Sequence, residues 1–185
     1  EHGGAVLTTT INKYCYISIR YLPPFFKHRY RVVYSKTENV REISEIEHPA
    51  VRAILQEANL SKGVVIQHDG DLPARSGLGS SSSFTVGLIN ALMALQGQMT
   101  EKIQLAKEAI RIEQKVLHET VGCQDQIATA CGGFNQIVFN RDGTFNIHPI
   151  IMEEDKKAWL ESHLMLFFTG ISRYSTEVAK KTVEN

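Results

Sequence analysis

The sequence predicts an α+β domain in which a mixed sheet packs on helices. Segments rich in β-branched and aromatic residues alternate with segments whose apolar residues recur every three or four positions. The chain has 185 residues, 43% of them hydrophobic, and is long enough to bury a sizeable core. It shows no internal repeat or low-complexity linker, so we expect one domain, or most of one domain of a larger protein.

Three strands and one helix are expected in the chain before residue 70. The β-rich runs 5–21 and 29–35 are predicted strands, and Leu-Pro-Pro-Phe-Phe bends the chain between them. Residues 48–60 have a helical period and begin with a proline suited to a first turn. Residues 63–69 are then a predicted strand that leads into a glycine- and serine-rich segment.

Helices dominate the expected structure after that segment. Apolar residues from Phe84 to Leu95 recur at spacings of four, four and three, which indicates a buried helix. Thr100 is expected to be the N-cap of the next helix, and the pair Gly132-Gly133 to end the third. The expected elements are helices at 81–96, 100–118 and 122–131, a hairpin of strands 134–139 and 144–150 with an Asp-Gly turn, a helix at 153–162, a strand at 163–170 and a helix from Ser175.

Charge and composition exclude several classes of function. The 20 basic and 20 acidic residues cancel without long runs, which argues against a surface for nucleic acid or membrane and favours a small-molecule ligand. No run is apolar enough for a membrane span and the first residues do not resemble a signal peptide, so we expect a cytoplasmic protein. Cys15, Cys123 and Cys131 form no CxxC pair and are expected to be reduced. The seven histidines lack ligand spacing, which argues against a transition metal but not against Mg²⁺ bound by oxygens.

In the segment 70–92, Gly77, Gly79 and four consecutive serines stand between a proline-containing turn and an apolar run. It could be a flexible spacer, a tight capped turn or an anion-binding loop. A strand before it and a helix after it anchor both ends, which argues against a spacer. Gly77 and Gly79 permit a turn that exposes N–H groups, and the serines stand where the first amides of a helix bind phosphate. Anion binding is therefore the favoured interpretation, although no Walker A, GxGxxG or GxSxG motif is present.

Two acidic residues stand at unusual positions. Glu113 falls on the apolar stripe of its helix, with apolar residues one turn before and after it. A carboxylate there needs a cation, a hydrogen-bond donor or water, so Glu113 is either paired with a distant Arg or Lys or is a metal ligand. Asp125 begins a short helix, where the helix dipole alone favours an acid, but its small and polar neighbours also suit a cavity. An anion loop and two carboxylates are the parts that phosphoryl transfer requires.

The serine-rich segment resembles the second motif of the GHMP kinases (galactokinase, homoserine kinase, mevalonate kinase and phosphomevalonate kinase), written P-x-x-x-G-L-G-S-S-A-A. The matching residues are Pro73, Gly77, Leu78, Gly79, Ser80 and Ser81. The resemblance covers essentially the whole chain and implies the N-terminal domain of this family, a fold similar to domain 2 of ribosomal protein S5. We expect residues 1–185 to lack the family's first strand segment and its C-terminal domain, and to catalyse poorly or not at all by themselves.

The resemblance also implies roles for single residues. The loop, with Ser80, Ser81 and Ser82, would wrap the phosphates of ATP. Ser81 and Glu113 would hold Mg²⁺. Asp125, twelve residues after Glu113, would take the proton from the substrate hydroxyl. Ser82 and Ser83 stand where the family commonly has alanine.

Segments 1–17, 122–135 and 169–181 look most like the sugar-phosphate branch of the family, the heptose 7-phosphate kinases, which phosphorylate an anomeric hydroxyl. The residues that would lie near the sugar are His2, Gly3, Gly4 and Arg173. The implied function is ATP-dependent phosphorylation of a sugar or sugar phosphate. Alternatives within the fold are a fucose-type sugar kinase, a mevalonate-pathway kinase or decarboxylase, a homoserine kinase, and a non-catalytic sensor. The oligomeric state does not follow from the sequence.

Overall fold

A computed structural model of the chain describes residues 3–74 and 76–167. The strands form a three-stranded sheet of order β1-β6-β7 and a four-stranded sheet of order β2-β5-β3-β4. These strands are β1 (Gly4–Thr9), β2 (Cys15–Tyr21), β3 (Tyr30–Val33), β4 (Thr37–Val40), β5 (Val64–Gly70), β6 (Phe134–Phe139) and β7 (Phe145–Pro149). The helices are α1 (Pro49–Glu57), α2 (Ser80–Leu95), α3 (Lys102–Arg111), α4 (Gln124–Cys131) and α5 (Glu154–Ser162), with a 3₁₀ turn η1 (Ile43–Glu45) and a π-helical turn η2 (Ile112–Val116).

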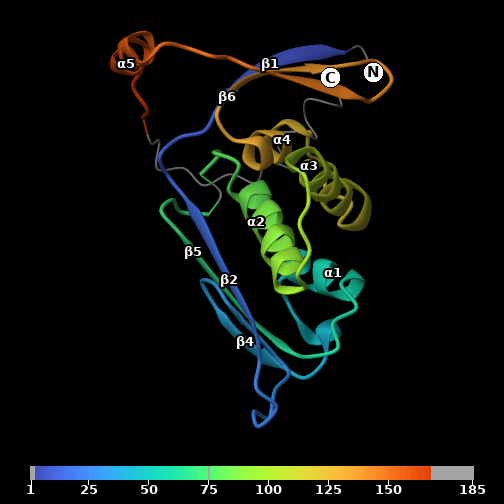
Figure 1. The fold of residues 1–185 in the computed structure, drawn as a ribbon. Coiled ribbons are helices and arrows are strands. Elements are labelled where there is room, and N and C mark those ends of the chain that lie inside the picture. The colour runs from blue at the N-terminus through green and yellow to red at the C-terminus, as the bar shows by residue number, and fades with distance from the viewer. Residues whose placement is uncertain (1–2, 75, 168–185) are drawn as a thin grey trace.

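Two apolar clusters hold the sheets and helices together. Helices α1 and α2 lie against the four-stranded sheet, and the three-stranded sheet lies beyond α3 and α4 (Figure 1). The larger cluster joins α1, α2 and the four-stranded sheet, with Leu55, Ile66 and Leu88 fully buried. The smaller one, around Ile127 and Ile137, joins α4 to the three-stranded sheet. Within the described residues, no helix has the length and apolar character needed to cross a membrane.

The α+β fold class is confirmed, and so are most of the predicted elements. Pro49 is the first residue of α1, as its position in the sequence predicts. Gly143, with a φ of 82°, makes the turn between β6 and β7, which pair antiparallel. Gly132 ends α4 with a φ of 67°. Left-handed backbone at both places explains why glycine is needed there.

The first predicted strand, 5–21, is wrong as a single strand. The chain leaves the three-stranded sheet after Thr9 and enters the four-stranded sheet at Cys15. The run of β-branched residues hides this crossing, because both halves favour extended backbone. Strand β4 escapes prediction because Glu38 and Asn39 are poor strand formers, yet it pairs with β3 at the edge of the sheet.

The expected helix 100–118 and the expected strand 163–170 also need correction. Glu101, with extended backbone, is the N-cap of α3, so Thr100 lies one residue too early. The α-helix ends at Arg111 and continues as the π-helical turn η2. The described part of the expected strand, 163–167, contains no strand, and its apolar side chains are exposed. The helix expected from Ser175 lies outside the described residues.

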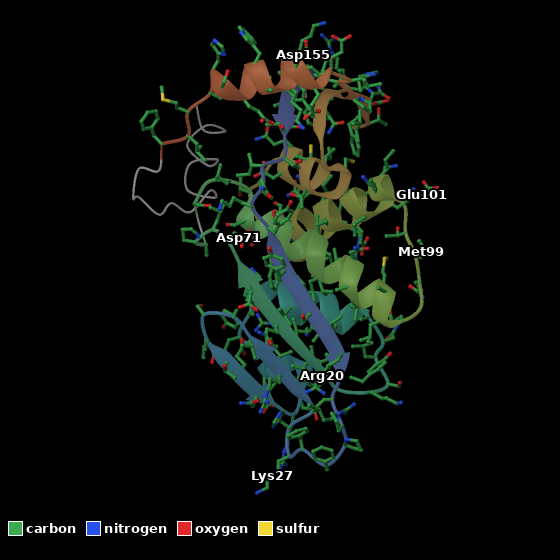
Figure 2. All side chains as sticks on the ribbon, turned by 60° about the vertical axis from the view of Figure 1, so that its left-hand side comes forward. Arg20, Lys27, Asp71, Met99, Glu101 and Asp155 are labelled. Atoms are coloured by element: carbon green, nitrogen blue, oxygen red, sulfur yellow. The ribbon has the colours of Figure 1, made fainter. Side chains whose placement is uncertain are left out.

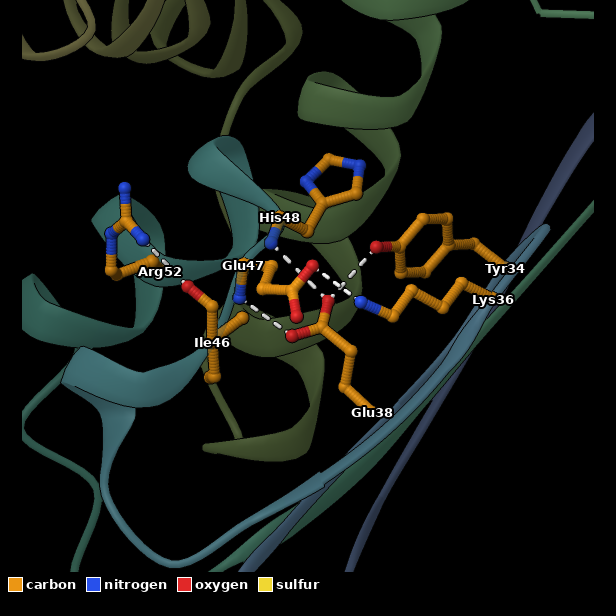
Figure 3. Close-up of polar contacts among 7 residues, drawn as sticks. All are labelled: Tyr34, Lys36, Glu38, Ile46, Glu47, His48 and Arg52. Atoms are coloured by element: carbon orange, nitrogen blue, oxygen red, sulfur yellow. Dashed lines mark hydrogen bonds and ion pairs between the residues drawn. The ribbon is translucent and has the colours of Figure 1, made fainter.

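A buried carboxylate anchors the start of α1 to β4 (Figure 3). Glu38, only 5% exposed, accepts hydrogen bonds from the Tyr34 hydroxyl (3.0 Å) and from the backbone N–H groups of Glu47 (2.6 Å) and His48 (3.2 Å). Burial acts to raise the pKa of Glu38, but these hydrogen bonds outweigh it and the pKa lies below its usual value. His48 in turn accepts a hydrogen bond from the N–H of Val51 (3.4 Å) and so caps α1.

Candidate active site

The glycine-serine loop forms a tight turn at the N-terminus of α2. Gly77 and Gly79 have φ angles of 77° and 70°, in the left-handed region that favours glycine. Gly79 is the N-cap of the 16-residue helix α2 and, as a glycine, has no side chain of its own to cap that end. The first N–H groups and the positive end of the helix dipole therefore favour an anion at this position. Because regular elements hold both ends of the segment, the geometry supports the anion-binding interpretation over a spacer.

The consecutive serines have different surroundings. Ser81 is exposed, whereas Ser82 is only 5% exposed. The hydroxyl of Ser82 donates to Oε2 of Glu113 (3.1 Å), and Ser83 contacts the hydroxyl of Thr129 (3.4 Å). The serine that contacts Glu113 is thus Ser82, which occupies a position commonly alanine in the family, while the assignment of Ser81 to Mg²⁺ remains a prediction.

Glu113 is held by the π-helical turn η2, where Leu117 donates its N–H to the carbonyl of Ile112 five residues earlier (2.9 Å). The Glu113 side chain is 1% exposed, as its place on the apolar stripe predicts. Oε2 accepts hydrogen bonds from Ser82 and from the amide of Gln126. Oε1 is buried and has no hydrogen-bond partner among the described residues. No Lys, Arg or His among the described residues forms an ion pair with Glu113.

Asp125 lies directly against the glycine-serine loop. It is the second residue of α4, and a Cβ atom placed on Gly79 would lie 3.5 Å from its Cγ. Partial burial raises the pKa of Asp125, although a hydrogen bond with Gln124 opposes the shift. The fold therefore brings a carboxylate of increased basicity next to the expected phosphate site.

Asp125 and the loop share a pocket of about 740 Å³. One wall comes from α4 and the start of α2, and the other from β1, the start of β2 and the segment between them. The lining residues are Val6, Leu7, Thr8, Thr9, Thr10, Ile11, Lys13, Tyr14, Cys15, Gly77, Leu78, Gly79, Ser83, Val86, Gly87, Gln124, Asp125, Ala128, Thr129 and Gly132. Among the described lining residues, Lys13 and Asp125 are the charged ones, so a cation and an anion share the pocket.

The segment between β1 and β2 is fixed to the end of β5. Asp71 accepts the N–H of Tyr14 through its Oδ2 (2.9 Å), and its own N–H donates to the Tyr14 carbonyl (3.0 Å). Asp71 lies at the opposite end of the four-stranded sheet from Arg20 (Figure 2). On the pocket wall, the Thr8 hydroxyl is buried without a hydrogen-bond partner among the described residues. The wall opposite Asp125 therefore offers hydroxyl groups and one ammonium group.

The remaining predicted site residues are more dispersed. Pro73 is exposed in the turn after β5 and does not line the pocket, whereas Leu78 does. Gly3 and Gly4 are at the far end of β1, where Gly4 pairs with Phe139, and neither lines the pocket. His2 and Arg173 lie outside the described residues.

Sequence reasoning missed three contributors to the site. Thr8 and Thr9 at the end of β1, Thr10 directly after it and Lys13 line the pocket, and Gln126 binds Glu113. Lys13 could have been singled out from the sequence, because a cation is unusual in a run of β-branched and aromatic residues. Gln126 follows Asp125 directly, but only the geometry of α4 shows that it faces Glu113.

Residues 44–133 match the family model of the GHMP kinases N terminal domain. A crystal structure of a D-glycero-D-manno-heptose 1-phosphate kinase from Bacteriodes thetaiotaomicron has a TM-score of 0.76 and 28% identity, over 86% of this chain and 55% of that one. The chain therefore has the fold of a GHMP kinase N-terminal domain, and residues 44–133 match the model of that family, as the motif predicts.

Curated relatives include the D-glycero-alpha-D-manno-heptose 7-phosphate kinase of Campylobacter jejuni. It is 33% identical over 108 residues, which are 58% of this chain and 32% of that protein. The mevalonate kinase of Thermococcus sibiricus is 26% identical over 155 residues, 83% of this chain and 43% of that protein. The matches thus span from about a third to just over half of the length of these kinases.

Proposed function

We propose that the chain is the catalytic N-terminal part of an ATP-dependent kinase that phosphorylates a hydroxyl of a sugar or sugar phosphate. Heptose 7-phosphate, phosphorylated at its anomeric hydroxyl, is the acceptor we favour. The identity to the heptose 7-phosphate kinase and the likeness to the heptose 1-phosphate kinase support this class of acceptor. The observation that carries the proposal is the closeness of Asp125 to Gly79, the N-cap of α2, where the helix start would bind the phosphates.

In this proposal the ATP phosphates bind at the start of α2. The backbone of Gly77 to Ser81 and the positive end of the helix would stabilise the charge on the transferred phosphoryl group. Asp125 would accept the proton of the attacking hydroxyl. Burial raises the pKa of Asp125, which makes it a better base than an ordinary aspartate.

The residues near Glu113 are suited to Mg²⁺, which prefers oxygen ligands. Oε1 of Glu113 is a buried oxygen without a partner among the described residues, and a cation there would relieve it. No three side chains of His, Cys, Asp or Glu gather as a cluster within 3–74 and 76–167, so phosphate, hydroxyl or water oxygens would complete the shell. When bound, Mg²⁺ would neutralise charge on the phosphates. Glu113 would hold it, with Ser81 as the second ligand that the resemblance implies.

The acceptor would occupy the pocket between Asp125 and the wall of β1. Threonine hydroxyls on the pocket wall, at the end of β1 and directly after it, can pair with sugar hydroxyls. Lys13 can pair with the phosphate group of a sugar phosphate. A pocket with both kinds of group suits a phosphorylated sugar better than mevalonate, because mevalonate is smaller and has fewer hydroxyl groups to pair.

Replacing the base tests the reaction. In the full-length kinase, Asp125→Asn should lower kcat by about 10²–10⁴-fold, because the amide cannot take a proton. Binding of an ATP analogue should be retained, because Asp125 is not assigned to the nucleotide. Steady-state kinetics and calorimetry measure the two effects. An unchanged kcat would reject the base assignment, and a wild-type protein that binds sugar and ATP without turnover would favour the sensor.

An acceptor panel tests the substrate class. The full-length protein should turn over heptose 7-phosphate or a related sugar phosphate with ATP. Turnover of mevalonate or homoserine alone would place the chain in another branch of the same family. Relatives named mevalonate kinase and galactokinase among the matches make both branches necessary members of the panel.

A further inference from the structure

Two glutamates are deeply buried among the residues that the structure describes, and their hydrogen bonding differs. Glu38 uses both carboxylate oxygens: Oε1 accepts from Tyr34 and His48, and Oε2 accepts from Glu47. Glu113 receives both of its donors on Oε2, and Oε1 receives none from the described residues. Glu38 therefore has the pattern of a carboxylate buried for structure, and Glu113 does not.

The one-sided pattern at Glu113 costs free energy in the absence of a ligand. A buried polar atom without a partner costs about 1–3 kcal/mol, and more when it is charged. The Oε1 atom of the Gln126 amide is also buried and unpaired within the described residues, so two oxygens lack partners in one small cluster. Gln126 and Glu113 are each only 1% exposed. Two neutral donors hydrogen-bond to the carboxylate but do not neutralise its charge.

Helix α4 connects this cluster to the pocket. Asp125 lines the pocket, and the next residue, Gln126, donates its amide N–H to Glu113 on the π-helical turn. Ser82, in the first turn of α2, supplies the other donor. The first turns of α2 and α4 thus hold Glu113 from two sides, while each also borders the expected phosphate site.

We propose that Gln126 is a positioning residue that, with Ser82, fixes Oε2 of Glu113 and reserves Oε1 for a divalent cation. The need for a cation rests on the kinase function proposed above, whereas the positioning role rests on the hydrogen bonds to Oε2. Partners that orient a metal ligand typically change metal affinity by about 10–100-fold when they are removed. Gln126 therefore acts on the metal through Glu113 and not by contact with the reacting atoms.

Gln126→Met in the full-length kinase tests this role, because methionine keeps the length of the side chain and removes the amide. With a saturating non-hydrolysable ATP analogue, the affinity for Mn²⁺, measured by electron paramagnetic resonance, should fall about tenfold or more. Gln114→Met is the matched control: Gln114 donates to the carbonyl of Val121 (3.0 Å) and has no hydrogen bond to Glu113. The control should keep the wild-type Mn²⁺ affinity, and Glu113→Gln should lose nearly all of it.

Each result decides the role of Gln126. Wild-type Mn²⁺ affinity in a folded Gln126→Met protein would overturn it, even if the enzyme is a kinase. Loss of affinity in both Gln126→Met and Gln114→Met would also overturn it, because general loosening would then be the cause.

If Gln126→Met does not fold, Ser82→Ala removes the other donor to Oε2, and unchanged Mn²⁺ affinity there overturns the role equally. A wild-type protein that turns over sugar phosphate but binds Mn²⁺ independently of Glu113 rejects the inference alone. Absence of both turnover and Mn²⁺ binding rejects the proposed function as well.

Discussion

Single residues of the serine run have separate consequences. Ser82 is buried and donates to Glu113, Ser83 touches Thr129, and Ser81 is exposed at the start of α2. The family motif indicates that this run matters, but not which hydroxyl faces inward. That distinction depends on the rotation of α2 about its axis, which is fixed by packing of its apolar face and not by the serines themselves.

Alanine substitutions should separate stability from catalysis within this run. Ser82→Ala should lower the free energy of unfolding by about 1–3 kcal/mol, because buried Glu113 loses one of its two donors. Ser81→Ala should leave stability unchanged and lower kcat, because an exposed hydroxyl packs against little but is the expected Mg²⁺ ligand. Urea unfolding and steady-state kinetics measure the two effects. Ser83→Ala is the control for catalysis, and a loss of kcat equal to that of Ser81→Ala would mean that the run is only a turn.

Whole elements were largely predictable where their local signals are strong. The proline of α1, the Asp-Gly turn of the hairpin and the glycine end of α4 all act within a few residues, so the sequence indicates them directly. The π-helical turn that carries Glu113 has no such signal in the sequence, and it packs against α1, which is far from it along the chain. The burial of Glu113 was predictable from its apolar stripe, but its partner Gln126 was not, since the two belong to different helices.

The junction of β4 and α1 should make stability depend on pH. Burial lowers the pKa of His48, with the nearby charge of Glu38 opposing this and His68 adding to it. The unfolded chain binds a proton near the ordinary value of 6.5, whereas the folded protein resists it, so stability should fall as the pH drops below about 6.5. A further loss should follow when the pH falls through the lowered pKa of Glu38.

Chemical denaturation from pH 7.5 to pH 4 measures this dependence. His48→Asn is the informative variant, because asparagine also caps helices but does not titrate. The variant should be less stable than the wild type near pH 7.5, since it loses the stacking of His48 on Phe84. Its stability should fall less between pH 6.5 and 5. His68, whose pKa burial also lowers, contributes to the slope that remains. Equal slopes in both proteins would show that His48 is not the group that titrates.

At the scale of the whole molecule, the pocket exists because the chain crosses from one sheet to the other. One wall of the pocket consists of β1 in one sheet, the start of β2 in the other and the segment between them. Asp71 fixes this segment through its hydrogen bond with Tyr14. A sequence read element by element treats 5–21 as one strand and therefore misses both the crossing and the place of Lys13. The opposite wall, with Gly79 and Asp125, was predictable because a short motif and a fixed spacing carry it.

Lys13 should determine the preference for phosphorylated acceptors. Within residues 3–74 and 76–167 it is the cation of the pocket lining, and its segment is fixed to β5, so its ammonium group can meet a phosphate held opposite Asp125. A hydrogen bond between charged groups contributes about 1.5–3 kcal/mol, which corresponds to about 10–150-fold in affinity. Lys13→Met in the full-length kinase should therefore raise KM for the sugar phosphate by about that factor and leave KM for the unphosphorylated sugar unchanged. KM for ATP, measured in the same assays, shows whether Lys13 binds the phosphate of the acceptor or a phosphate of ATP. A rise in KM for ATP, with equal loss for both sugars, would place Lys13 at the nucleotide and not at the acceptor.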